Sequence, residues 1–455
     1  IQATINKIKI YGNTRVYEEV IRRELELKPG DLFSMTAFKG SYQDIAQMGH
    51  FDPEALTPNE WVKPDRTTGT VDLNIGLTPK ASDQIEFSLG WGQTGIIGKV
   101  GLKFTNFSMR NLIGKNRNHR GIIPQGDGQE FEISASTNGS YYQSYSISFL
   151  DPWFGRKRPN QLSVSAFFSR QTDISSSYYN SAYYNNYYSM LYGVGNYNSS
   201  YYNNYSSYYD PDKYIELFGL SVGFGKHLTW PDNRFNFMAT LGYTRYMMKD
   251  WEYFIIQNGN CNDINLTLNL TRRSIDNPIF PRSGSDISAS VSFTPPYSLF
   301  DNVDYEHMAT DYYNANYQND ISRKHRWIEY HKWKFNSKFY TPLSGANKCF
   351  VLMTRFDFGI LGHYNKYKKS PFGTFYMGGD GMSGYSYTYY SETIGLRGYD
   401  NGALTQGING YGYAYDRMTL ELRYPLMLNG STNIYALAFV EGGNTWSEVK
   451  QFNPF

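Results

Sequence analysis

The sequence predicts a β-barrel that crosses a membrane, preceded by a small α+β domain of about 80 residues. Segments of alternating apolar and polar residues recur from residue 81 onward, and the connections between them alternate between short and long. The composition agrees: 18% of residues are aromatic, only 18% are charged, and the longest apolar run, Ile434–Val440, has seven residues. A transmembrane helix needs about 20 apolar residues, so helical membrane proteins are excluded.

Charge and cysteine content exclude further classes. The chain has 43 basic and 41 acidic residues, a formal net charge of +2, so it lacks the basic excess of a nucleic-acid-binding protein. Two cysteines in 455 residues are too few for a disulfide-stapled fold. The sequence begins at Ile1 without an apolar signal-peptide core, so we expect a fragment or a processed chain.

The first eighty residues differ from the rest because they contain helical periodicity. Thr4–Tyr11 reads as a short strand that Gly12-Asn13 ends. Apolar residues at helical spacing follow Thr14, a candidate N-cap, and Pro29-Gly30 stops that helix. A second helix is expected over Ser34–Met48, and Thr70–Leu77 returns to the period of a strand. The predicted order is β-α-α-β-β.

From Ala81 onward the period is two. Gln84–Gln93 and Asp263–Thr271 show the pattern most clearly, with apolar side chains on one face and polar or small ones on the other. Similar alternation predicts thirteen strands in all: 84–93, 97–107, 130–138, 141–154, 161–172, 214–228, 235–250, 263–271, 285–295, 325–343, 349–364, 412–426 and 434–446.

Strand length favours a membrane barrel over a soluble sandwich. Soluble strands average five or six residues, whereas a tilted strand needs about nine to eleven to cross a bilayer. Aromatic residues such as Trp153, Trp230 and Trp446 stand near strand ends, where membrane proteins form interfacial belts. The sequence thus predicts an outer-membrane β-barrel. Thirteen is odd, whereas bacterial single-chain barrels have even counts, so either closing strands are missing from this chain or alternation has miscounted the strands.

Several motifs occur along the chain, namely Gly12–Thr14, Ile21–Leu25, Pro29–Ser34, Met48–Pro53, Asp276–Gly284, Pro371–Gly379 and Gly395–Asp400. Together they resemble the outer-membrane-protein-85 superfamily over essentially the whole chain. The resemblance implies a POTRA domain over 1–80, the last of a series whose earlier repeats are absent, and a barrel of sixteen-stranded type over 81–455 that lacks its last strands. It also implies residence in the bacterial outer membrane with the POTRA domain in the periplasm.

Arg397-Gly398-Tyr399 matches the superfamily's Arg-Gly-aromatic loop signature. The resemblance implies that this loop folds into the barrel, where a desolvated arginine needs carboxylate partners. By position these are Glu421 and Glu441. Alternation places Glu421 on the lumen face; Glu441 groups with Phe439, so either the lumen holds aromatics or Gly442-Gly443 marks a bulge. The alternative is a solvated loop arginine.

The resemblance implies an assembly factor that folds β-barrel proteins and inserts them into the outer membrane, without cofactor or metal. Its first strand would pair with an incoming strand at a lateral seam. Implied partners are nascent outer-membrane β-barrel proteins and periplasmic accessory lipoproteins of an assembly complex. The alternative is a two-partner secretion pore that exports one dedicated substrate. Residues of the seam strand are Ile85, Phe87, Leu89 and Trp91, with Gly90 and Gly92 weakening one end.

Three remaining features have competing interpretations. Ser175–Asp212 contains thirteen tyrosines and is either a solvated low-complexity loop or a docking surface for a surface lipoprotein or glycan. Gly219–Gly223 matches the G-x-S-x-G motif of hydrolases, but it lies mid-strand, so we interpret it as chance and predict no enzyme activity. Cys261 and Cys349 fall at opposite strand ends and should be free thiols.

Overall fold

The computed structural model describes most of residues 3–453. It divides into two compact units, residues 1–139 with 144–165, and residues 140–143 with 166–455. Within 3–453, the residues outside the description are 53–54, 82, 93–94, 114–122, 139–141, 156–159, 173–211, 233, 253, 278–279, 346–348, 380–390, 401, 407–410 and 430–431.

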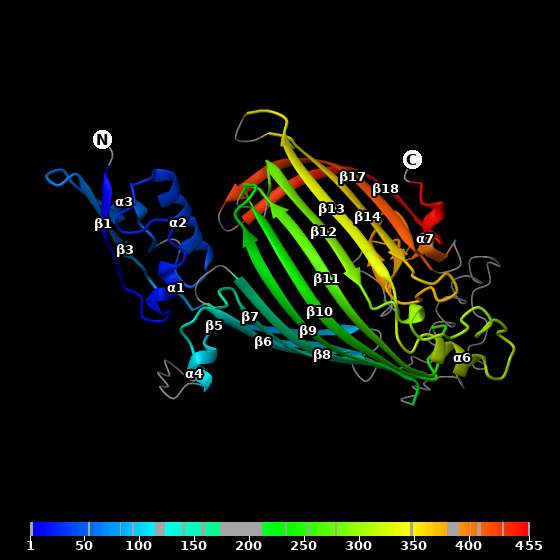
Figure 1. Ribbon diagram of the computed structural model, residues 1–455. Coiled ribbons are helices and arrows are strands. Elements are labelled where there is room, and N and C mark those ends of the chain that lie inside the picture. The colour runs from blue at the N-terminus through cyan, green and yellow to red at the C-terminus, as the bar shows by residue number, and fades with distance from the viewer. Residues whose placement is uncertain are drawn as a thin grey trace. The chain divides into compact units, whose positions relative to one another are not determined.

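The N-terminal region folds around a three-stranded sheet of order β1-β3-β2, with β1 parallel and β2 antiparallel to β3. Three helices accompany the sheet (Figure 1). Apolar side chains from both, such as Ile21, Ile45 and Leu73, form one buried core. The elements are β1 (Thr4–Tyr11), α1 (Glu18–Arg22), α2 (Met35–Gln47), α3 (Pro58–Trp61), β2 (Val62–Asp65) and β3 (Thr70–Gly76).

Two details of this region differ from the sequence prediction. The first helix is only five residues long and begins after Tyr17, not after Thr14. The reason is that the Asn13 side chain accepts hydrogen bonds from the backbone N–H groups of Arg15 and Val16, which holds a turn there. The short helix α3, which buries Trp61, was not predicted.

Within the described part of the chain, the remaining long strands form one antiparallel sheet of thirteen strands, which confirms the predicted number. The order follows the chain from β4 to β14 and then β17 and β18, so β4 and β18 are its two end strands. Their bounds are β4 (Gln84–Gly92), β5 (Gly95–Phe107), β6 (Gln129–Asn138), β7 (Tyr142–Asp151), β8 (Asn160–Thr172), β9 (Tyr214–Leu228), β10 (Phe235–Lys249), β11 (Gly259–Arg273), β12 (Gly284–Phe293), β13 (His331–Pro342), β14 (Val351–Gly362), β17 (Ala414–Asn429) and β18 (Thr432–Trp446).

The two faces of these strands have different side chains, as alternation predicts. On β9 the exposed Phe218, Leu220 and Val222 alternate with Gly219, Ser221 and Gly223 on the other face. The G-x-S-x-G motif is therefore the small-residue row of a regular strand and lacks the strand-to-helix turn of a hydrolase elbow. None of the described helices is both long and apolar enough to cross a membrane.

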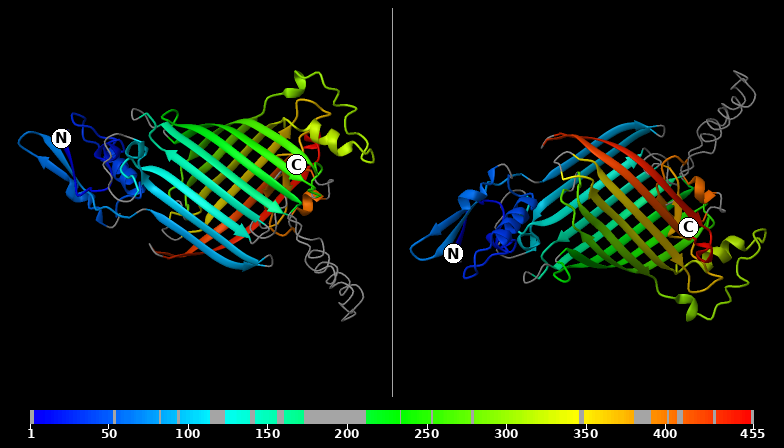
Figure 2. Two further views of the ribbon diagram at one scale, coloured as in Figure 1. Left: turned by 90° about the horizontal axis from the view of Figure 1, so that it is seen from below. Right: turned by 90° about the horizontal axis from the view of Figure 1, so that it is seen from above.

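One predicted strand began too early. The segment 325–343 forms β13 only from His331, because His325 caps α6 (Tyr317–Lys324) and Trp327 bridges to Asn262 of β11. Short elements also fill the segment between β14 and β17: β15 (Thr374–Met377) pairs in parallel with β16 (Ser391–Ile394), and α7 (Ala403–Gln406) follows. Figure 2 shows α6 and α7 at the same end of strands β9–β18.

Candidate functional site

The Arg-Gly-aromatic signature lies just after β16 and is anchored by its neighbours. Leu396 is fully buried, and its backbone N–H donates to the carbonyl of Gly379 (2.8 Å). Gly379 N–H in turn donates to the carbonyl of Tyr399 (2.9 Å). Gly398 has φ of +91°, a conformation that side chains with a Cβ rarely adopt, so glycine fits this turn.

Arg397 lies against both acidic residues named from the sequence. Its Nε donates to Glu441 Oε2 at 3.1 Å, and its backbone N–H donates to the same oxygen at 3.0 Å. Its Nη2 is 3.9 Å from Glu421 Oε2. The two carboxylate side chains are only 6% exposed, whereas that of Arg397 is 37% exposed. The loop is thus held to the sheet through the Arg397 side chain and main chain together.

Strand pairing explains why Glu441 faces the same side as Glu421. Thr419 is opposite Glu441 and Glu421 is opposite Phe439 in an unbroken register, and the bulge between β17 and β18 lies farther along, at Pro425 to Met427. Of the two alternatives from the sequence, aromatic side chains on this face or a bulge at Gly442-Gly443, the first therefore holds. The Phe439 ring centre is 3.4 Å from the Arg397 guanidinium carbon, a cation–π contact that supports the arginine.

Residues that sequence reasoning missed complete the attachment of the loop. Arg417 of β17 donates to the carbonyl of Gly395 (2.6 Å) and pairs with the fully buried Asp357 (2.6 Å). Lys332 and Lys334 of β13 pair with Glu392 of β16 at 2.8 and 2.5 Å. A signal was present, since Arg417 has the same alternation parity as Glu421.

A pocket of about 290 Å³ lies next to Arg397, and part of this charged cluster lines it. Its walls carry more cations than carboxylates, and each of Asp357, Glu421 and Glu441 has an arginine within 4 Å. Thr419 also donates to Glu441 (2.9 Å). Because each of these carboxylates is paired with an arginine, the arrangement is suited to holding the loop in place rather than to proton transfer.

The predicted seam strand β4 is an end strand whose apolar row is exposed. Ile85, Phe87 and Leu89 are 79%, 72% and 68% exposed, the pattern of side chains that face lipid or a partner. The strand pairs with β5, and Glu86 binds Lys99 across that pair at 2.8 Å. A Cβ on Gly90 would meet nothing within 4 Å, so packing does not require glycine there. The side chains of Trp91 and Gly92 lie outside the described residues.

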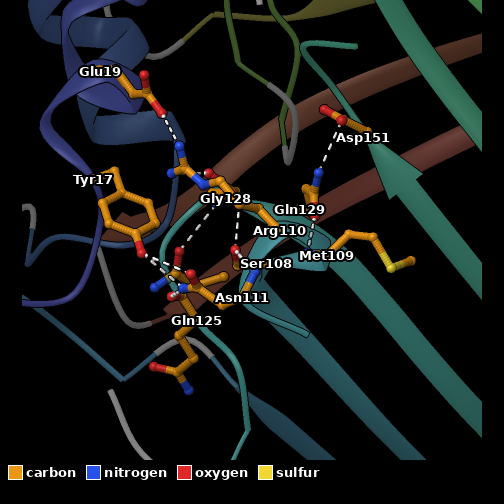
Figure 3. A network of polar contacts seen from close by, with 12 residues as sticks. Tyr17, Glu19, Ser108, Met109, Arg110, Asn111, Gln125, Gly128, Gln129 and Asp151 are labelled. Carbon is orange, nitrogen blue, oxygen red and sulfur yellow. Dashed lines mark hydrogen bonds and ion pairs between the residues drawn. The ribbon is translucent and has the colours of Figure 1, made fainter. Parts of the chain in front are cut away.

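A polar network within the first compact unit joins the N-terminal region to the segment between β5 and β6 (Figure 3). The hydroxyl of Tyr17 lies 3.0 and 2.8 Å from the side-chain Oδ1 and Nδ2 of Asn111. Arg110 binds Glu19 at 3.1 Å and lies over the Tyr17 ring at 4.3 Å. Gly126, with φ of +136°, accepts from Tyr17 N–H (2.8 Å), and a Cβ there would clash with the ring. No sequence motif indicated this junction.

A second contact of the same junction buries charge. The Trp153 indole donates to Glu24 (2.8 Å), and the Arg23 guanidinium lies 5.1 Å from the Trp153 ring centre. Burial raises the pKa of the Glu24 carboxyl, while Arg23 and the indole act in the opposite direction. Burial likewise lowers the pKa of His50, helped by the nearby charge of Arg15.

The tyrosine-rich segment and the two cysteines were also singled out from the sequence. The tyrosine-rich segment 175–212 lies, except for Asp212, outside the described residues. Cys261, at the start of β11, and Cys349, just before β14, are both buried thiols in separate apolar clusters.

Comparison with known proteins gives two family matches and several relatives. Residues 125–455 match the Omp85 superfamily domain, and residues 3–80 match POTRA, described as a surface antigen variable number repeat. The chain is 23% identical to the outer membrane protein assembly factor BamA of Neisseria meningitidis serogroup B, over 97% of this chain and 46% of that protein. It is 28% identical to a putative outer membrane protein assembly factor of Treponema pallidum, over 33% of this chain and 16% of that protein.

Among solved structures, the chain resembles BamA from Haemophilus ducreyi lacking POTRA domains 1–3, with a TM-score of 0.54 and 17% identity. The match covers 98% of this chain and 72% of that one, and it shows a shared fold. The chain spans less than half the length of the Neisseria relative.

Proposed function

The chain belongs to the Omp85 superfamily, and we propose that it is an assembly factor that folds β-barrel proteins and inserts them into the outer membrane. Its fold is a membrane β-barrel with a POTRA domain, so it resides in the bacterial outer membrane with that domain in the periplasm. The relatives are named as assembly factors, and we propose no enzyme activity.

The observation that carries the proposal is the end strand β4 with its exposed row Ile85, Phe87 and Leu89. In hydrocarbon, an unpaired backbone N–H or C=O costs several kcal/mol, so a strand that enters lipid alone is strongly disfavoured. An end strand offers a row of such groups to pair with. We propose that β4 templates the last strand of a substrate in this way, at a lateral seam.

The loop that carries Arg397 supports this function indirectly. Its ion pairs to Glu441 and Glu421 tie it to β17 and β18, the strands at the opposite end of the sheet order from β4. We propose that the loop keeps these strands ordered while β4 exchanges partners. The role assigned to Arg397, Gly398 and Tyr399 is therefore positional.

The partners proposed are nascent outer-membrane β-barrel proteins and periplasmic accessory lipoproteins of a BAM-type complex. The tyrosine-rich segment 175–212 is proposed as a docking surface for a surface lipoprotein. We also propose the domain boundary at residue 80, with the POTRA domain over 1–80 and the barrel over 81–455.

Depletion of the protein in its host, followed by quantitative outer-membrane proteomics, tests the function. An assembly factor should lower the abundance of many unrelated β-barrel proteins. Loss of a single secreted protein, with the other barrels intact, would instead identify a two-partner secretion pore and would contradict strand templating.

Cysteine crosslinking tests the templating step. Ser88→Cys places a thiol on the end strand β4, and Ser221→Cys places one on β9, an internal strand of the same sheet. A stalled substrate barrel with cysteines in its last strand should crosslink to the β4 variant and not to the β9 control. Equal crosslinking at both positions would contradict a specific role for β4.

A further inference from the structure

Three arginines from two distant parts of the chain line one pocket of about 460 Å³. Arg245 comes from β10, Arg323 from the last turn of α6, and Arg326 from the segment that follows α6. The rest of the lining consists of asparagine, serine and glycine. Among the described residues no carboxylate lines the pocket, and none of the three guanidinium groups has one within 4 Å. A helix C-terminus favours a basic residue such as Arg323 but does not explain the other two.

The frame of the pocket is fixed by backbone contacts. Asn262 N–H donates to the carbonyl of Arg326 (2.9 Å), and Ile328 N–H donates to the carbonyl of Asn262 (2.9 Å). Gly259 allows the helix to approach β11, because a Cβ there would lie 2.0 Å from the Ser322 hydroxyl oxygen. The main chain is therefore held in place while the three arginine residues remain exposed, an arrangement suited to binding an anion.

The side-chain order along β10 places the pocket at the membrane surface. On the outward face, Leu241 is 57% exposed, Tyr243 follows, and Arg245 comes next. Arg245 is about 13 Å along the strand from Leu241, at roughly 3.3 Å per residue. The Tyr243 hydroxyl donates to Asn262 (3.0 Å) directly beside the pocket. An apolar, then an aromatic, then a cationic side chain is the order expected where a strand passes from the hydrocarbon core into the head-group layer of a membrane.

A neighbouring aromatic side chain supports the placement of the pocket at the membrane surface. Trp327 is 39% exposed, lies next to Arg326, and bridges to Asn262 of β11. Exposed tryptophans beside lipid-facing strands collect at the membrane–water interface. The pocket therefore faces the head-group layer at the end of the strands where α6 lies.

We propose that this pocket binds the phosphate group of an anionic membrane lipid. Three unneutralised guanidinium groups supply donors in forks that match phosphate oxygens, and the side chains of Asn260 and Asn319 supply further donors. The adjacent exposed apolar row accommodates the lipid's acyl chains, which a soluble phosphate compound lacks. The bound lipid holds α6 against β10 and β11.

Electron spin resonance of lipid probes tests the proposal. The full chain is placed in phosphatidylcholine vesicles with spin-labelled phosphatidic acid or spin-labelled phosphatidylcholine, and the motionally restricted fraction gives the relative association constant. The wild type should prefer phosphatidic acid. Arg245→Gln with Arg323→Gln and Arg326→Gln should lower this preference roughly tenfold, because three solvent-exposed ion pairs to the phosphate, each weak by itself, are lost together.

Control variants test whether the lipid preference depends on this pocket. Arg273→Gln removes an arginine at the other end of β11 whose charge is already paired with Asp286 (3.1 Å), so it should leave the preference unchanged. Migration on semi-native gels before and after heating verifies that each variant is folded, and Arg323→Gln with Arg326→Gln alone serves if the triple variant is not. An unchanged preference in a folded variant would overturn the proposal. Displacement of the lipid probe by millimolar inorganic phosphate would identify a free-phosphate site instead.

Discussion

Replacing Arg397 by alanine should weaken the attachment of the loop between β14 and β17, because the ion pairs to Glu441 and Glu421 are lost. The change removes the Nε hydrogen bond to Glu441 (3.1 Å), the contact with Glu421 (3.9 Å) and the cation–π contact with Phe439 (3.4 Å). It keeps the main-chain hydrogen bond to Glu441 (3.0 Å), because that donor is the backbone N–H.

The expected loss follows from these contacts. A hydrogen bond to a charged group contributes about 1.5–3 kcal/mol, and an exposed cation–π contact adds about 0.5–1 kcal/mol. Because the Arg397 side chain is 37% exposed, we take the lower part of this range, about 2 kcal/mol. That free energy corresponds to an opening equilibrium of the loop raised roughly 30-fold.

The assay is the rate of proteinase K cleavage within residues 363–413 of the folded chain in detergent, mapped by mass spectrometry. Under conditions where opening is faster than cleavage, the rate follows the open population. Lys213→Ala is the matched control, since it breaks an exposed ion pair with Glu252 and should change the rate less than about fivefold. The docking of Arg397 is refuted if the cleavage rate of Arg397→Ala lies within twofold of the wild-type rate. The variant would then also show the same change of gel migration on heating, and cells that carry it as their sole copy would grow normally.

Three further predictions concern buried groups. Cys261 and Cys349 should be unreactive towards a thiol reagent in the folded chain and should give two free thiols after unfolding; a lower count would contradict the absence of a disulfide. Burial, with nearby lysine charges, lowers the pKa of His325 to about 3. As the pH falls, the unfolded segment binds a proton on His325 before the folded one does. The free energy of unfolding of residues 294–330 should therefore be full above about pH 6.5 and lower by about 2 kcal/mol at pH 5, as measured by hydrogen exchange. His325→Phe should make this free energy less dependent on pH. Lys368→Met should lower the free energy of unfolding by about 3–5 kcal/mol, because the buried carboxylate of Glu329 loses its ion-pair partner. The measurement is the melting midpoint, and adding Glu329→Leu should restore much of the lost stability.

Strand positions were predictable because the relevant pattern is local. Alternation of side chains between two faces is a property of neighbouring residues, and it located all thirteen strands of the sheet, including β4 from Gln84 and β9 from Tyr214. The same parity predicted the face of Glu421. It failed at the start of β13, where α6 and the contact with Asn262 hold residues 325–328 outside the strand.

The ion-pair partners of charged side chains were harder to predict, because they depend on how distant segments of the chain pair. Arg417 and Asp357 are 60 residues apart in sequence, and only the pairing of β14 with β17 brings them together. The cationic pocket likewise combines Arg245 with Arg326, which no motif connects.

The sequence by itself determined the membrane fold, the strand faces and the Arg397 motif, because the solvents on the two faces of a strand dictate its residue pattern. Only the tertiary structure decided that Glu441 faces Arg397 and that Arg417 and Glu392 share in holding the loop. An ion pair depends on the distance between two side chains, and in a sheet that distance is set by register across strands rather than by any pattern within one strand.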